Sequence, residues 1–92
     1  MDFFSILVNQ SHEWQVNSFL EPGKTCRLTE QHMEFGSTLE NCKTKAMQQG
    51  YRYIYFQDTS VRPEGEWCHI YKSCVNTRTP EKAGTNYEYM GK

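Results

Sequence analysis

Two segments set the expected fold of this chain: Ser37-Thr38-Leu39-Glu40-Asn41-Cys42 and Glu66-Trp67-Cys68-His69-Ile70-Tyr71-Lys72-Ser73-Cys74. The first has the pattern of a helix start, because Ser37 can cap a helix while Glu40 reaches back to its amide. The second begins with alternating aromatic and aliphatic residues, which is typical of a strand. One cysteine on a helix and two on or after a strand predict a disulfide-stapled α+β domain.

The expected helix is amphipathic and ends at Gly50, a residue that readily takes the left-handed conformation at a helix end. Leu39, Cys42, Ala46 and Met47 recur at helical spacing between the two ends. This spacing places Cys42 on the buried face of the helix.

Two strands are expected after the helix, at residues 51–56 and 67–72, separated by turn-forming residues at 58–65. Alternation puts Cys68 and Ile70 on one face of the second strand. It gathers aromatic rings on the opposite face, which predicts a platform for contact with a protein or a sugar. The platform would comprise Tyr51, Tyr53, Tyr55, Trp67 and Tyr71, unless a terminal segment covers it.

Composition limits both the size of the core and the kinds of partner. The chain has 92 residues, 37% hydrophobic and 14% aromatic, which is enough for one domain with a small core. A net charge of −1 with interspersed signs argues against nucleic acid and anionic lipid as partners. The apolar start of the chain is too short to span a bilayer, so no transmembrane segment is expected.

The four cysteines favour an oxidising compartment and allow three pairings. Cys68 and Cys74 would lie roughly 20 Å apart along a continuous strand. That separation exceeds the roughly 7 Å limit between the Cα atoms of a disulfide. Of the two remaining pairings we favour Cys42 with Cys68, which joins helix and strand, and Cys26 with Cys74.

Neither a metal site nor a catalytic site is expected from the spacing of the residues. The alternative for the cysteines is a zinc site with His32 or His69 as added ligands, but zinc ligands usually occur in close pairs such as C-x2-C, and the chain has no such pair. His12, His32 and His69 are dispersed, and none has a nucleophile at a spacing that implies a triad. We therefore expect a non-enzymatic protein without a cofactor.

Residues 1–25 differ from the remainder of the chain because they are apolar without a strict period. They could complete the core as a strand, or form an arm that docks on a partner. The expected organisation is an N-terminal arm at 1–25 and a domain at 26–92, with a short strand at 86–90. The candidate contact residues in the arm are Phe3, Phe4, Ile6, Leu7 and Trp14.

Residues 26–89 resemble the PAN/apple family. The resemblance lies in the segment Ser37-Thr38-Leu39-Glu40-Asn41-Cys42, the strand Tyr53-Ile54-Tyr55-Phe56, and Cys68-His69-Ile70-Tyr71. A second helix cysteine of the family is replaced by Ala46, and its partner in the following strand is also missing. The ending from Cys74 to Tyr87 is similar to PAN-like modules of unicellular algae.

The resemblance implies one central helix on a small curved antiparallel sheet, in a non-catalytic module that binds protein or carbohydrate. The algal likeness implies an accessory subunit of a large complex on the lumenal side of a membrane, for instance a photosynthetic complex facing the thylakoid lumen. The alternative is a secreted, extracellular lectin-like or adhesion module.

Overall fold

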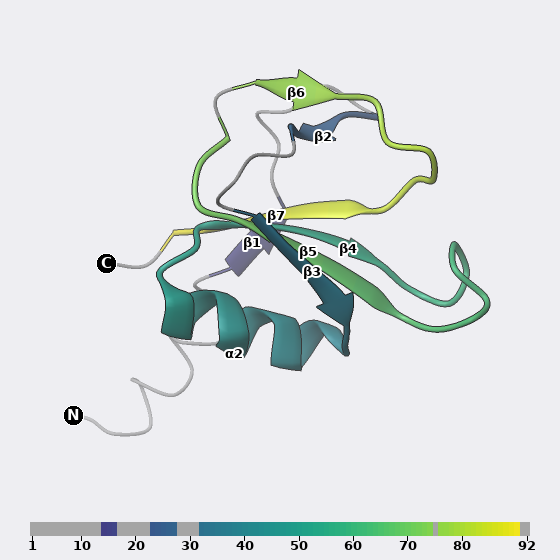
Figure 1. Ribbon diagram of the computed structural model, residues 1–92, viewed down its shortest axis with the longest axis horizontal. Helices are drawn as coiled ribbons and strands as arrows, with labels where there is room; N and C mark the ends of the chain where they lie inside the picture. The colour runs from purple at the N-terminus through teal and green to yellow at the C-terminus, as the bar shows by residue number, and fades with distance from the viewer. Residues whose placement is uncertain (1–13, 17–22, 28–31, 75, 91–92) are drawn as a thin grey trace.

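The computed structural model describes residues 14–16, 23–27, 32–74 and 76–90. Within these ranges the chain is α+β, as the sequence predicts, with one helix, two small antiparallel sheets and two disulfides (Figure 1). In the described part of the chain, no helix is long and apolar enough to cross a membrane.

The larger sheet has five antiparallel strands in the order β1-β7-β4-β5-β3. The two strands expected after the helix are confirmed as β4 and β5, the adjacent strands near the middle of the sheet. The strand expected at residues 86–90 is β7. The strand bounds are β1 Trp14–Val16, β3 His32–Gly36, β4 Tyr53–Gln57, β5 Trp67–Tyr71 and β7 Thr85–Tyr89.

The smaller sheet pairs β2, Thr25–Cys26, with β6, Thr77–Arg78. Figure 1 places it above the five-stranded sheet, on the side opposite the helix. The five-stranded sheet is therefore covered on one face by the helix and on the other by the smaller sheet.

Helix α2, Leu39–Gln49, has a different N-cap from the expected one. The capping residue is Thr38, whose hydroxyl oxygen accepts a hydrogen bond from the backbone N–H of Asn41 at 3.2 Å. Ser37 instead donates its hydroxyl to the carbonyl of Thr38. Serine and threonine both cap well, so the sequence alone could not select between these neighbours. The expected helix end is confirmed, because Gly50 is left-handed at φ 77°.

The core has two parts, one on each face of the larger sheet. Cys42 and Ala46 of α2 are fully buried against Ile54, Cys68 and Ile70 on the helix side. On the other side a smaller cluster of buried side chains consists of Cys26, Tyr55 and Tyr71.

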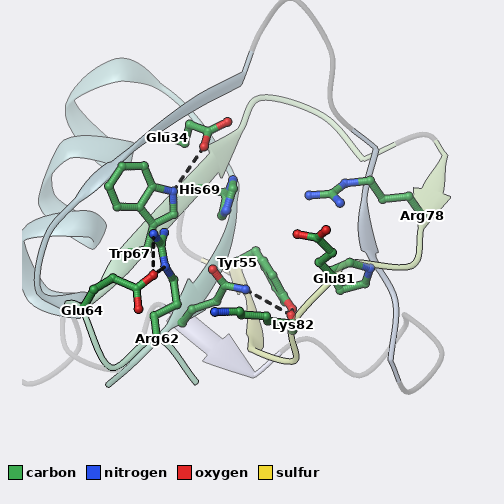
Figure 2. A pocket seen from close by; sticks show the side chains of 11 residues that line it. Glu34, Tyr55, Arg62, Glu64, Trp67, His69, Arg78, Glu81 and Lys82 are labelled. Atoms are coloured by element: carbon green, nitrogen blue, oxygen red, sulfur yellow. Dashed lines mark hydrogen bonds and ion pairs between the residues drawn. The ribbon is translucent and has the colours of Figure 1, made fainter. Parts of the chain in front are cut away.

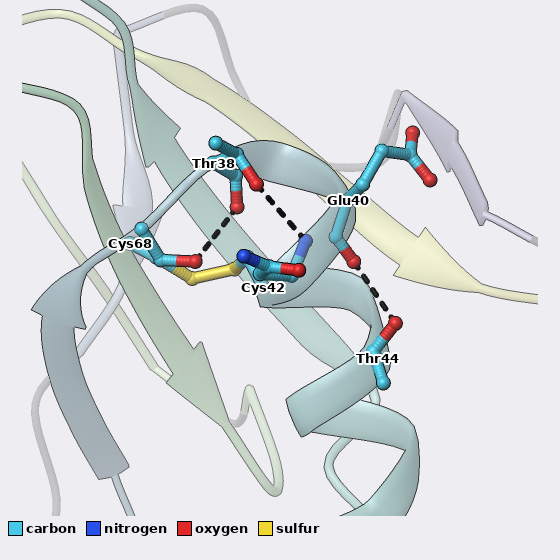
Figure 3. Close-up of a disulfide and its surroundings, with 7 residues drawn as sticks. Thr38, Glu40, Cys42, Thr44 and Cys68 are labelled. Atoms are coloured by element: carbon cyan, nitrogen blue, oxygen red, sulfur yellow. Dashed lines mark hydrogen bonds between the residues drawn. A yellow bond between two sulfur atoms is a disulfide. The ribbon is translucent and has the colours of Figure 1, made fainter.

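Each part of the core contains one disulfide. Cys42 joins α2 to β5 through Cys68, with the Cα atoms 6.1 Å apart (Figure 3). Cys26 joins Cys74 on the opposite side, with a Cα separation of 5.1 Å. This is the pairing that the sequence favours, and two disulfides indicate an oxidising environment.

The segment expected to be an arm contributes a strand to the sheet. β1 pairs with β7, and the Trp14 ring is buried with its centroid 5.2 Å from that of Tyr89. Trp14 is therefore a core residue, which corrects its assignment to a contact surface. The other arm residues proposed for contact lie outside the described residues, namely Phe3, Phe4, Ile6 and Leu7.

Candidate functional site

A pocket of about 370 Å³ lies on the face of the five-stranded sheet that the helix does not cover. Residues of β3, β4 and β5 line it together with the turn at 62–64 and the segment at 78–82 (Figure 2). Charged side chains therefore surround a floor of aromatic rings.

The segment at 78–82 is fixed to the sheet by hydrogen bonds to one carbonyl. The hydroxyl of Tyr55 and the side-chain amide of Gln57 both donate to the carbonyl oxygen of Lys82, the amide at 3.1 Å. Gly84, two residues further on, lies so close to β4 that a Cβ there would be 2.7 Å from the Phe56 carbonyl oxygen. Only glycine fits this approach without a shift of the chain, so the pocket wall has a defined position.

The mouth of the pocket is built around Trp67. The guanidinium of Arg62 stacks on its ring, with the guanidinium carbon 4.5 Å from the ring centroid. Glu64 holds Arg62 through an ion pair of 3.2 Å. The indole N–H of Trp67 donates to a carboxylate oxygen of Glu34 at 3.2 Å. Contacts from both sides thus fix the orientation of the ring.

Two histidines lie beside Glu34. In the antiparallel pair of β3 and β5, Glu34 is directly opposite His69, and His32 is opposite Tyr71. The Nε2 atom of His32 is 3.3 Å from the second carboxylate oxygen of Glu34. The rings of His32 and His69 stack with centroids 6.1 Å apart.

Burial controls the protonation of His69. Its desolvation lowers the pKa from 6.5 to about 4, against the opposing effect of the Glu34 carboxylate. Burial also tends to raise the pKa of Glu34, but the hydrogen bond from Trp67 and the neighbouring histidines outweigh it and hold that pKa below its usual value. Near neutral pH the site therefore combines a neutral imidazole with an ionised carboxylate.

The structure separates the residues of the expected aromatic platform. Tyr55 and Tyr71 are 1% and 0% exposed, so neither can contact a partner directly. The smaller sheet covers them, which the sequence left as an alternative. Tyr51 packs with the helix-side core, and Tyr53 packs against the buried tyrosines. Two platform residues line the pocket, Tyr55 and Trp67, and of these Trp67 is the one that is not fully buried.

Sequence spacing does not group the polar residues of this site, and it gives no sign of a role for Glu34. The useful signal was the alternation His32-x-Glu34, which places both side chains on one face of a strand. Only the pairing of β3 with β5 then brings His69 to the same place. Sequence spacing could not supply that register.

Comparison with known protein families, with curated proteins and with solved structures finds no match for this chain.

Proposed function

We propose that this chain is a non-catalytic protein-binding module, an accessory subunit that docks on a larger complex through the pocket at Trp67. The observation that carries the proposal is the stacking of Arg62 on Trp67 at the pocket mouth. Tryptophan and arginine are enriched among the residues that dominate protein interfaces. Because Glu64 and Glu34 already hold this pair, a partner would lose little entropy in ordering it.

The charges around the pocket support a protein partner. Both signs occur in close proximity, which suits a partner surface of complementary pattern. A surface of one sign, as nucleic acid or anionic lipid requires, is not offered by this pocket. The charged lining residues are Arg62, Arg78 and Lys82 together with Glu34, Glu64 and Glu81.

The family and the compartment belong to the same proposal. A helix joined by a disulfide to an antiparallel sheet supports membership of the PAN/apple family. The two disulfides support a lumenal or extracellular location. With the algal likeness of the sequence, these features favour the lumenal side of a membrane, as in a photosynthetic complex of the thylakoid.

The test is to isolate the native protein from the cells that make it, under non-denaturing conditions. We expect it to migrate within a large complex. Arg62→Ala should release it from that complex while leaving it folded. Arg27→Ala is the matched control, because Arg27 is exposed and does not line the pocket. A protein that migrates as a free monomer, or one whose assembly is equally affected by both variants, would contradict the proposal.

A second candidate is a lectin-like module. Planar polar side chains such as Gln57 and Arg78 line the pocket beside Trp67, and this combination suits the hydroxyls and apolar face of a sugar. A free secreted species that binds immobilised glycans, and loses the binding with Trp67→Ala, would favour this function over the first.

A further inference from the structure

We propose that His32, Glu34 and His69 form a binding site for a divalent first-row transition metal ion. Each residue offers one ligand atom, and the three atoms lie within 4.8 Å of one another. Two imidazoles and one carboxylate are a set that binds zinc and neighbouring metals. This proposal is independent of the protein partner, and it replaces the expectation of no metal that followed from sequence spacing.

The separation of the first two ligand atoms suits a shared metal. Ligand atoms about 2.0 to 2.1 Å from a tetrahedral zinc ion lie about 3.3 Å from each other. His32 Nε2 and the nearer carboxylate oxygen of Glu34 are 3.3 Å apart. The ligand atom of His69 lies within 4.8 Å of the other two. To reach the spacing of about 3.3 Å around zinc, its imidazole would have to move by at most roughly 1.5 Å.

Burial of His69 is a separate observation that points to a ligand. The residue is 9% exposed, and its Nδ1 atom is buried without a hydrogen-bond partner among the described residues. A buried polar atom without a partner costs free energy, so such atoms are uncommon in folded proteins. Metal coordination by the ring would use hydrogen-bonding capacity that the protein leaves unsatisfied.

The surroundings of Glu34 resemble the outer shell of a metal site. Trp67 donates to one carboxylate oxygen, which leaves the other directed at His32. Hydrogen bonds of this kind orient metal ligands and increase metal affinity.

A metal at this place would border the pocket, because Glu34 and His69 line it. Three protein ligands leave at least one coordination position for water or for an oxygen atom of a bound partner. The metal would therefore join β3 to β5 and present an open coordination position to the pocket.

The test is isothermal titration calorimetry with Zn²⁺. The protein is the full chain without a tag, with its disulfides intact and treated beforehand with a chelator. We expect one ion per chain with micromolar or tighter affinity. Glu34→Gln and His69→Gln should each weaken binding by at least about tenfold. Zinc should also shift the ring resonances of His32 and His69 in NMR spectra, while those of His12 stay unchanged.

Two control variants remove residues of the same types, a glutamate and a histidine, from places outside the proposed metal site. Glu40→Gln removes an exposed carboxylate from α2, on the other side of the sheet, and His12→Gln removes the remaining histidine of the chain; both should bind zinc like the wild type. If His69→Gln does not fold, Glu34→Gln decides, because that side chain is 43% exposed. Binding weaker than micromolar, or equal binding by Glu34→Gln and the wild type, would overturn the proposal.

Discussion

The indole nitrogen of Trp67 donates a hydrogen bond of 3.2 Å to a carboxylate oxygen of Glu34 across the paired strands β5 and β3. The same ring receives the guanidinium of Arg62 on its face. One tryptophan thus connects the mouth of the pocket with the proposed metal ligands. Its two roles can be separated, because the first uses the N–H group and the second uses the aromatic ring.

Trp67→Phe should weaken zinc binding by about tenfold while it preserves stacking with Arg62. Phenylalanine keeps an aromatic face but cannot donate to Glu34, so the carboxylate loses its fixed orientation. Trp14→Phe is the matched control, because the indole nitrogen of Trp14 has no hydrogen-bond partner among the described residues. Calorimetry that gave the same zinc affinity for Trp67→Phe and Trp14→Phe would count against the role of this hydrogen bond.

Gly84→Ala should lower the free energy of unfolding by about 1 to 3 kcal/mol. The new Cβ would lie 2.7 Å from the Phe56 carbonyl oxygen and 2.8 Å from the Tyr55 ring, so the segment must move away from β4. Gly36→Ala is the control, because its nearest neighbour would be the Trp67 ring at an ordinary 3.5 Å. Denaturant unfolding of both variants measures the difference, and equal stability would show that the wall of the pocket yields easily.

Removal of the Cys26 to Cys74 disulfide should lower the free energy of unfolding by up to about 4 kcal/mol. The entropy lost by the unfolded chain when a loop of 48 residues is closed corresponds to about 4 kcal/mol. The actual loss of stability should be smaller, because the second disulfide already constrains the same loop. The double variant Cys26→Ala, Cys74→Ala should also increase amide hydrogen exchange in β2 and β6 much more than in β4 and β5. Uniform exchange across both sheets would mean that the smaller sheet does not open by itself.

The stability of the metal-free protein should fall as the pH is lowered from about 6.5 to about 4. The folded state keeps His69 neutral down to about pH 4, whereas the unfolded chain takes up a proton near pH 6.5. In that interval protonation therefore favours unfolding. His69→Gln should flatten this dependence, and His12→Gln should not. The charged or titratable groups that act on His69 are Glu34, His32, Arg78 and Arg62.

Urea unfolding at several pH values in the presence of a chelator measures this dependence. Glu34 affects stability at lower pH. Folding lowers the pKa of its carboxyl, so its contribution to stability is complete above pH 4.5, the usual pKa of glutamate, and is lost as the pH falls below that value. Between pH 4.5 and pH 6.5 the change in stability therefore reports His69 and not Glu34. An unchanged slope in His69→Gln would contradict the burial of a neutral imidazole.

Local signals in the sequence were sufficient for the helix and for β4, β5 and β7, whereas β3 was not predicted. Gly50 determined the end of α2, and the period of two predicted β4 and β5. Alternation also put Cys68 on the helix side, which is why its bond to Cys42 was foreseeable. These features depend on neighbours in the chain, so spacing and residue type carry the information.

The polar site was not predictable in the same way, because it depends on contacts between distant segments. Glu34 and His69 meet only through the register of β3 with β5. The cover over Tyr55 and Tyr71 comes from β2 and β6, each two residues long and without a recognisable strand pattern. The burial of Trp14 could not be predicted from the sequence, because its strand has three residues, too few to show an alternation of apolar and polar side chains.

Two deletions distinguish the part of the N-terminal segment that belongs to the fold from the part that is proposed to dock. Removal of residues 1–12 should leave a folded, disulfide-bonded domain, because β1 and its buried Trp14 remain. Removal of residues 1–20 should cost about 3 to 5 kcal/mol more, as expected for the loss of a buried tryptophan. Denaturant unfolding measures both.

The docking prediction for Phe3, Phe4, Ile6 and Leu7 then depends on the shorter deletion alone. These apolar side chains need burial, and a partner surface can provide it. A folded protein without residues 1–12 that no longer joins its complex would support docking by this segment. A shorter deletion that unfolds the domain would place these residues in the core instead, and one that assembles normally would leave the pocket at Trp67 as the contact surface.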